Sequence, residues 1–179
     1  MSVESRQKLI PELENRSNDL YPVVLDRLPN LYQPPNISNS DQTIFENPQS
    51  FDELLKKQRD FQEYKVVLKR KPEVQESLDM NQAFTLKLGF SPIETYLEKY
   101  LQKEKFLLTL NNFPYNVPED TKHLIAWYRG NTPPSDLSQF LASKFSEYTI
   151  GEDDFVFYRN LPTRMSIPRF DHLQILVRK

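Results

Sequence analysis

Apolar residues recur close to helical spacing from residue 50 onwards. Ser50 followed by Glu53 fits a capping box, in which the two side chains satisfy free backbone N–H groups at a helix start. The apolar positions behind this start predict an amphipathic helix over residues 51–70. They are Phe51, Leu54, Leu55, Phe61, Tyr64 and Leu68. A second helix is predicted over residues 73–88, ending before Gly89.

The clearest helix start lies at residue 91. Ser91 fits the N-cap, Pro92 the first helical position and Glu94 the third. The apolar stripe of this helix contains Ile93, Tyr96, Leu97, Tyr100 and Leu101. We expect Ile93, Leu97 and Leu101 to pack on a sheet.

After residue 105 the pattern changes to short runs of β-branched, aromatic and aliphatic residues, bounded by Pro, Asn and Asp. These runs predict four strands, at residues 106–110, 122–129, 155–159 and 172–178. A short helix over residues 135–145 is predicted between the second and third strands, with Leu137, Phe140, Leu141 and Phe145 inward. Helices first and then mostly strands predict an α+β fold, with the N-terminal helices packed on one face of a mostly antiparallel sheet of about four strands.

The N-terminal part of the chain has a different composition. Residues 29–49 are rich in Pro, Asn, Ser and Gln, so we expect a flexible strap without regular structure. If it packed, Ile37, Ile44 and Phe45 would be its anchors. Before it, residues 4–20 predict a helical arm that docks on the domain or binds a protein partner. This arm carries Leu9, Ile10, Leu13 and Leu20. The chain therefore divides into an arm and proline-rich strap, 1–49, and one α+β domain, 50–179.

Composition removes several classes of function. With 23 basic and 25 acidic residues the net charge is −2, which argues against a nucleic-acid partner. Zero cysteines exclude disulfides, Cys-type zinc sites and iron–sulfur clusters, and three glycines exclude a Gly-rich phosphate loop. We expect no metal and no cofactor. Since no apolar run resembles a signal core or a membrane span, we expect no membrane partner and a cytoplasmic location that can also include the nucleus.

An ordered series of short segments carries a resemblance to a known family. They are 112–118 (NFPYNVP), 123–127 (HLIAW), 153–162 (DDFVFYRNLP) and 166–168 (SIP), followed by His172. The series, covering about residues 90–179, resembles a largely fungal family of domains of unknown function that includes the N-acetylglucosamine-induced protein. The resemblance implies an intracellular protein linked to an amino-sugar or nutrient response, and it implies no reaction. The family pattern ends with two histidines one residue apart, whereas this chain has His172-Leu173-Gln174, which argues against two-histidine or metal-binding chemistry here.

The two histidines each open a predicted strand. Because side chains alternate along a strand, the polar positions of two neighbouring strands would converge on one sheet face. Those positions are His123, Trp127, Arg129, His172, Gln174 and Arg178. The set is compatible with a pocket floor, and equally with a solvated sheet face.

The C-terminal 25 residues carry a formal charge of +4 in an acidic chain. Arg164 and Arg169 flank the turn that contains Ser166, directly before His172, and arginine presents a fork of donors suited to phosphate or carboxylate. We therefore expect an anion site formed by these four residues with Trp127 and Arg129. The alternative is that the arginines pair with acidic residues of the chain.

No catalytic pattern decides whether the chain is an enzyme. Asp171 and His172 are adjacent and would point to opposite faces of a strand, and no nucleophile elbow is present. Two functions remain. The first is a regulatory or adaptor protein of an amino-sugar or nutrient response that binds a protein partner through the arm. The alternative is a binder of, or an enzyme acting on, an anionic, sugar-phosphate-like metabolite at the Arg/His face.

Overall fold

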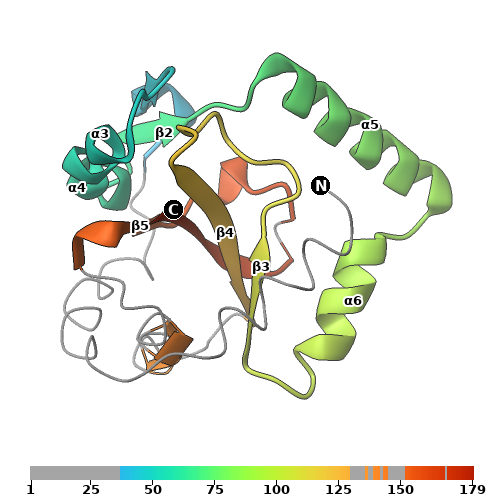
Figure 1. The fold of residues 1–179 in the computed structure, drawn as a ribbon. Helices are drawn as coiled ribbons and strands as arrows, with labels where there is room; N and C mark the ends of the chain where they lie inside the picture. Colours follow the sequence, from blue (N-terminus) through green and yellow to red (C-terminus); the bar gives the residue numbers. More distant parts are fainter. Residues whose placement is uncertain (1–36, 130–135, 137–138, 142, 145–151, 168) are drawn as a thin grey trace.

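The computed structural model describes residues 37–129, 136, 139–141, 143, 144, 152–167 and 169–179. Its centre is a four-stranded antiparallel sheet in the order β3-β4-β6-β5. The strands are β3 (Phe106–Leu110), β4 (Thr121–Tyr128), β5 (Phe155–Tyr158) and β6 (Asp171–Arg178). The long pair β4 and β6 forms the middle of the sheet (Figure 1). The predicted α+β fold and its four strands are confirmed.

One face of the sheet carries an apolar core. Leu108, Leu124 and Ile175 lie on it, and Phe140 and Leu141 pack against them. Between β4 and β5, the described residues 136, 139–141, 143 and 144 are helical, as predicted for 135–145. Leu137 and Phe145 lie outside the described residues. The helices are therefore not all N-terminal, because this helical segment lies between β4 and β5 in the chain.

The second face is covered at the β5 edge by α3 (Phe51–Lys56) and α4 (Gln58–Gln62). Phe51 and Phe61 are buried there, and the Phe61 ring stacks on Tyr158 with centroids 4.7 Å apart. The Ser50 cap is present, since Ser50 Oγ accepts from the Glu53 N–H. The Glu53 carboxylate accepts from the N–H of Gln49 rather than from that of Ser50.

The single helix predicted over 51–70 is wrong. The helix is interrupted at Lys57, whose N–H bonds back to Leu54 and Leu55, and α4 ends at Gln62. Tyr64 then adopts a left-handed backbone conformation, φ 59°, and the chain continues as the strand β2 (Val66–Leu68). The buried residues of two short helices and of a fully buried strand together give nearly the apolar spacing of one helix, which explains the error.

The expectation that residues 29–49 lack regular structure is wrong for residues 39–45. Here the chain forms the 3-10 turn η2 (Asn39–Asp41), capped by Ser38, and the strand β1 (Thr43–Phe45). β1 pairs in parallel with β2. Backbone pairing therefore holds this segment in place despite its polar composition. The part before residue 37 lies outside the described residues.

At the β3 edge the second face is covered by α6 (Pro92–Tyr100), with Leu97 and Leu101 buried against Trp127. Ile93 packs on the same cluster at its margin. The predicted start is confirmed, because Ser91 Oγ accepts from the Glu94 N–H at 3.3 Å.

The helix before α6, α5 (Pro72–Leu88), is the longest in the described structure. It ends at Gly89, which has φ 71° in the left-handed region that glycine adopts without strain. The helix predicted over 73–88 is confirmed. Figure 1 shows α5 at the rim of the molecule, away from the sheet and at an angle to α6. Two 3-10 turns complete the described elements, η3 (Glu152–Asp154) and η4 (Pro162–Arg164).

Candidate functional site

The structure brings four of the predicted polar residues together on the second sheet face. His123, Trp127, His172 and Gln174 all point to this face, since Trp127 lies opposite His172 and Ile125 opposite Gln174 in the β4–β6 register. All four are buried. The face is not solvated, because α3, α4 and α6 cover it from two sides. These four residues are called the polar cluster below.

The hydrogen bonds of His123 fix its tautomer. The backbone N–H of Tyr115 donates to Nδ1 at 3.1 Å, so Nδ1 carries no proton. Nε2–H therefore donates to Gln174 Oε1, at 2.6 Å. The Tyr115 ring stacks on the imidazole, with centroids 5.0 Å apart. Burial lowers the pKa of His123 to about 3, despite the bond to Gln174, which by itself would raise it. His123 is thus a neutral, fully engaged interior residue.

His172 is held in a similar way. Its Nδ1 lies 3.0 Å from the carbonyl oxygen of Phe170, to which it donates, and its ring lies against Trp127 with centroids 4.6 Å apart. The Trp127 indole N–H donates to Thr109 Oγ1 at 2.9 Å. Burial lowers the pKa of His172, so it is neutral at pH 7. A neutral imidazole offers an anion no positive charge.

The arginines of the predicted anion site lie apart. Arg164 donates through Nε to Gln42 Oε1 at 2.6 Å and through Nη2 to the Asn39 carbonyl, which ties η4 to the segment before β1. Arg169 pairs with Glu98 of α6 at 2.9 Å. Arg129 donates to the carbonyl oxygen of the same Glu98.

Ser166 is exposed, and His172 lies below the surface. Arg178 pairs with Asp52 at 2.7 Å and does not join the polar cluster. The structure therefore gathers Arg129 and Arg169 near Glu98 and leaves Arg164 elsewhere. Binding of an anion by these residues stays a prediction.

One charged pair and one surface were not predicted from the sequence. The pair is Arg159 with Asp171, joined by two parallel hydrogen bonds of 2.7 and 2.8 Å at the end of β5. Burial by itself would lower the pKa of Arg159, but the bonded carboxylate outweighs it and raises the pKa. The pair fixes the loop after β5 to the start of β6. Within the described ranges, no group of three or more His, Asp, Glu or Cys residues is arranged to hold a metal ion.

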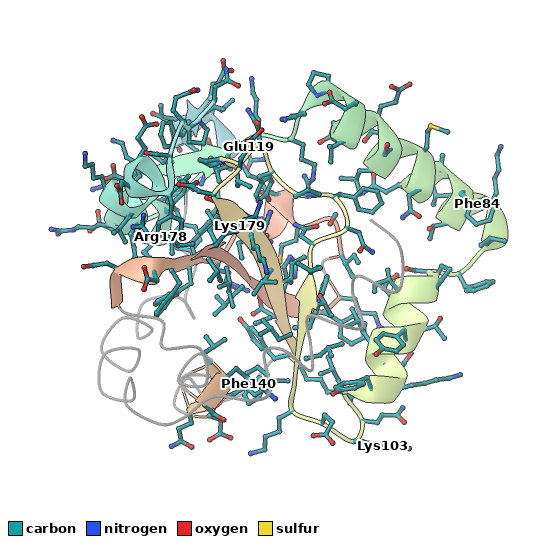
Figure 2. The ribbon with its side chains drawn as sticks, viewed as in Figure 1. Phe84, Lys103, Glu119, Phe140, Arg178 and Lys179 are labelled. Carbon is teal, nitrogen blue, oxygen red and sulfur yellow. The ribbon has the colours of Figure 1, made fainter. Side chains whose placement is uncertain are left out.

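The surface lies on α5, where only Leu78 among the helix residues is buried. Met80, Phe84 and Leu88 follow one another at intervals of four and are 67%, 58% and 40% exposed. Phe90, just beyond the helix, is 55% exposed. These four residues are called the α5 surface below. Figure 2 shows Phe84 near the far end of α5, away from the sheet.

Leu86 is also exposed, at 82%, but it belongs to another side of the helix. At 3.6 residues per turn it lies about 200° around the axis from Phe84. The signal that could have revealed the α5 surface is present in the sequence. The large apolar residues of 73–88 do not fall on one stripe, so a single packed face cannot bury them all.

Comparison with known proteins gives a family but no activity. A family model described as "Protein of unknown function (DUF3605)" matches residues 39–178, beginning within the segment predicted as a strap. No curated protein matches the chain. A solved structure titled "Crystal Structure of HTC1" is similar over 63% of this chain and 76% of that one, at 21% identity and a TM-score of 0.36. No helix among the described residues has the length and apolar character needed to cross a membrane.

Proposed function

The chain belongs to the DUF3605 family of proteins of unknown function, and we propose that this member is a non-enzymatic adaptor that binds a partner protein through its α5 surface. The observation that carries the proposal is the exposure of Met80, Phe84, Leu88 and Phe90 within eleven consecutive positions. Single exposed apolar residues are normal, but neighbouring ones on successive helix turns are typical of interaction sites.

The chemistry of these side chains suits a protein partner. Aromatic residues and Met are enriched in protein interfaces, and Met adapts to irregular surfaces because it is unbranched and polarisable. Burying one such side chain in an interface contributes roughly 1.5–3 kcal/mol of favourable free energy to binding. A helix that exposes its apolar positions at intervals of four can lie against the apolar side of another helix.

The polar cluster supports a non-enzymatic role rather than a catalytic one. Both buried histidines are neutral, and each donates a ring N–H to its own chain. His123 in addition accepts from the Tyr115 N–H, which leaves it no atom for a substrate. The resemblance to the family of the N-acetylglucosamine-induced protein is what would connect the adaptor to an amino-sugar or nutrient response.

The test places a photo-crosslinking amino acid at position 84 in cells, with position 86 on the other side of α5 as the matched control. The expected result is a discrete adduct with another protein at 84 and none at 86. The purified partner should then bind Phe84→Ser at least tenfold more weakly than wild type, while Leu86→Ser binds normally. Equal adducts at both positions, or equal affinity of the two variants, would overturn the proposal.

A further inference from the structure

An arginine without an acidic partner lies beside the polar cluster. Arg70 is half-buried in the link between β2 and α5. Its Nε–H donates to the carbonyl oxygen of Phe113 at 2.8 Å, and its guanidinium carbon lies 4.7 Å from the centre of the Tyr115 ring. The neighbouring Lys69 pairs with Glu46 at 2.7 Å, whereas within the described ranges no ion pair includes Arg70. Its terminal nitrogens are therefore donors that no carboxylate of the described chain engages.

Two tyrosine hydroxyls close to this arginine also have a proton to donate. The Tyr115 hydroxyl accepts from Asn160 Nδ2 at 2.7 Å, but no described residue accepts the proton of the hydroxyl itself. The Tyr158 hydroxyl is fully buried and has no hydrogen-bond partner among the described residues. Both tyrosines belong to one buried cluster. Burial raises the pKa of Tyr158, Tyr115 raises it further and Arg70 lowers it, so the three groups lie within electrostatic range of one another.

These donors indicate what kind of ligand would fit them. Buried hydroxyls are almost always hydrogen-bonded, so the guanidinium and the two tyrosines together suit a group rich in acceptor oxygens. A water molecule would serve the hydroxyls, but it would not balance the charge of Arg70. That charge is single, because burial keeps His123 and His172 neutral at pH 7. A planar carboxylate with one negative charge matches a guanidinium in both geometry and charge.

We propose that Arg70, Tyr115 and Tyr158 bind a small organic carboxylate, whose oxygens accept from the guanidinium and from the tyrosine hydroxyls. The rings of the two tyrosines offer apolar contact to the rest of the ligand. The anion site predicted from the sequence does not include these residues, and its arginines already bond to other residues of the chain. The carboxylate site uses no residue of the α5 surface, so it goes beyond the adaptor function and does not depend on it.

The test is an NMR titration of the isotopically labelled full-length protein at pH 7, with sodium acetate as the probe. The expected result is a saturable shift of the Arg70 Nε–H signal, which is identified by its loss in Arg70→Lys. Acetamide has the same shape without the charge, and sodium chloride matches the ionic strength, so neither should move this signal. A response to acetate no larger than the response to these two controls would overturn the site. Tighter binding of inorganic phosphate than of acetate would overturn the assignment to a singly charged carboxylate.

Variants separate the contributions of the ligand-binding groups. Arg70→Gln should weaken acetate binding about tenfold or more, because a charge-assisted hydrogen bond is lost. Lys71→Gln, at the exposed neighbouring position, is the matched control and should leave acetate binding nearly unchanged.

Tyr158→Phe gives a second test that does not depend on the folding of Arg70→Gln. It should weaken acetate binding several-fold, while the thermal midpoint without acetate stays at the wild-type value, since the hydroxyl bonds to no described residue. Wild-type affinity in Arg70→Gln would overturn the proposal. A lowered midpoint with wild-type affinity in Tyr158→Phe would show that this hydroxyl serves the fold and not a ligand.

Discussion

Two consecutive helices of this protein share several terminal signals, although only α6 has a side-chain N-cap, and they lie in different environments. α5 and α6 both have proline in the first turn, an acidic residue near the N-terminus and a lysine in the last turn. Leu97 of α6 is fully buried, and Leu101, at its C-cap, is nearly so. α5 is almost twice as long and buries only Leu78.

The difference shows that two separate properties of a sequence act on a helix. Start and stop signals, with residue propensity, decide that the helix forms. The placement of apolar residues around the axis decides whether it packs. Ile93, Leu97 and Leu101 share one side and reach Trp127 on the sheet. On α5, Met80, Phe84 and Leu88 share one side and Leu86 lies on another, and all four remain exposed and available for another molecule or another segment.

The largest effect that sharpens this comparison is expected at Leu97. Leu97→Ala leaves a cavity against the sheet and should lower the free energy of unfolding by about 2–5 kcal/mol. The matched change on α5, Leu86→Ala, removes an exposed side chain and should change it by less than about 0.5 kcal/mol. Urea unfolding measures both. Equal losses in the two variants would mean that α5 is packed as α6 is.

A second effect is expected in the polar cluster beneath α3, α4 and α6. Gln174→Leu removes the acceptor of His123 Nε2–H and leaves a buried donor unpaired, which should cost about 1–3 kcal/mol of unfolding free energy. Gln82→Leu, at an exposed position of α5, is the control and should be close to neutral. Unchanged stability of Gln174→Leu would show that the bond to His123 contributes nothing.

The pH dependence of stability follows from the lowered pKa of His123. The folded protein keeps His123 neutral down to about pH 3, whereas the unfolded chain takes up the proton near pH 6.5. Below pH 6.5 the unfolded state therefore binds more protons, and stability falls as the pH decreases from 6.5 towards 3.

Between pH 7 and pH 5 this single group should remove about 2 kcal/mol of stability. His123→Gln lacks the titrating ring. Between pH 7 and pH 5 its unfolding free energy should therefore fall by about 2 kcal/mol less than that of wild type. Groups common to both proteins cancel in the difference. Parallel pH curves for wild type and variant would contradict the lowered pKa.

Much of the fold could be predicted because its signals are local. The four strands are short apolar runs between turn residues, and α6 has a complete start at Ser91. The break of residues 51–70 into two helices and a strand could not be predicted. The turn at Tyr64 needs a left-handed backbone, and the residue there is not the glycine that usually indicates one. The strand β1 was missed since it forms by pairing with β2, a contact that the polar segment itself does not encode.

The candidate site, like the fold, could be predicted from the sequence only in part. Strand alternation correctly placed His123, Trp127, His172 and Gln174 on one face. Which face of the sheet the helices cover depends on tertiary packing, which the local sequence does not determine. The polar cluster, compatible by sequence with a pocket floor, is therefore found buried in the interior. Arg164 was grouped with His172 by sequence proximity, yet its partners are Gln42 and Asn39, more than a hundred residues earlier.

The central claim is that the α5 surface belongs to binding and not to the core, and the unfolding free energy of full-length Phe84→Ser tests it most directly. Phe and Ser have similar helix propensities, so the substitution leaves the helix itself nearly unaffected. The prediction is a change of less than about 1 kcal/mol, close to that of an ordinary surface substitution. A loss of about 3 kcal/mol or more, as for a buried Phe, would contradict it.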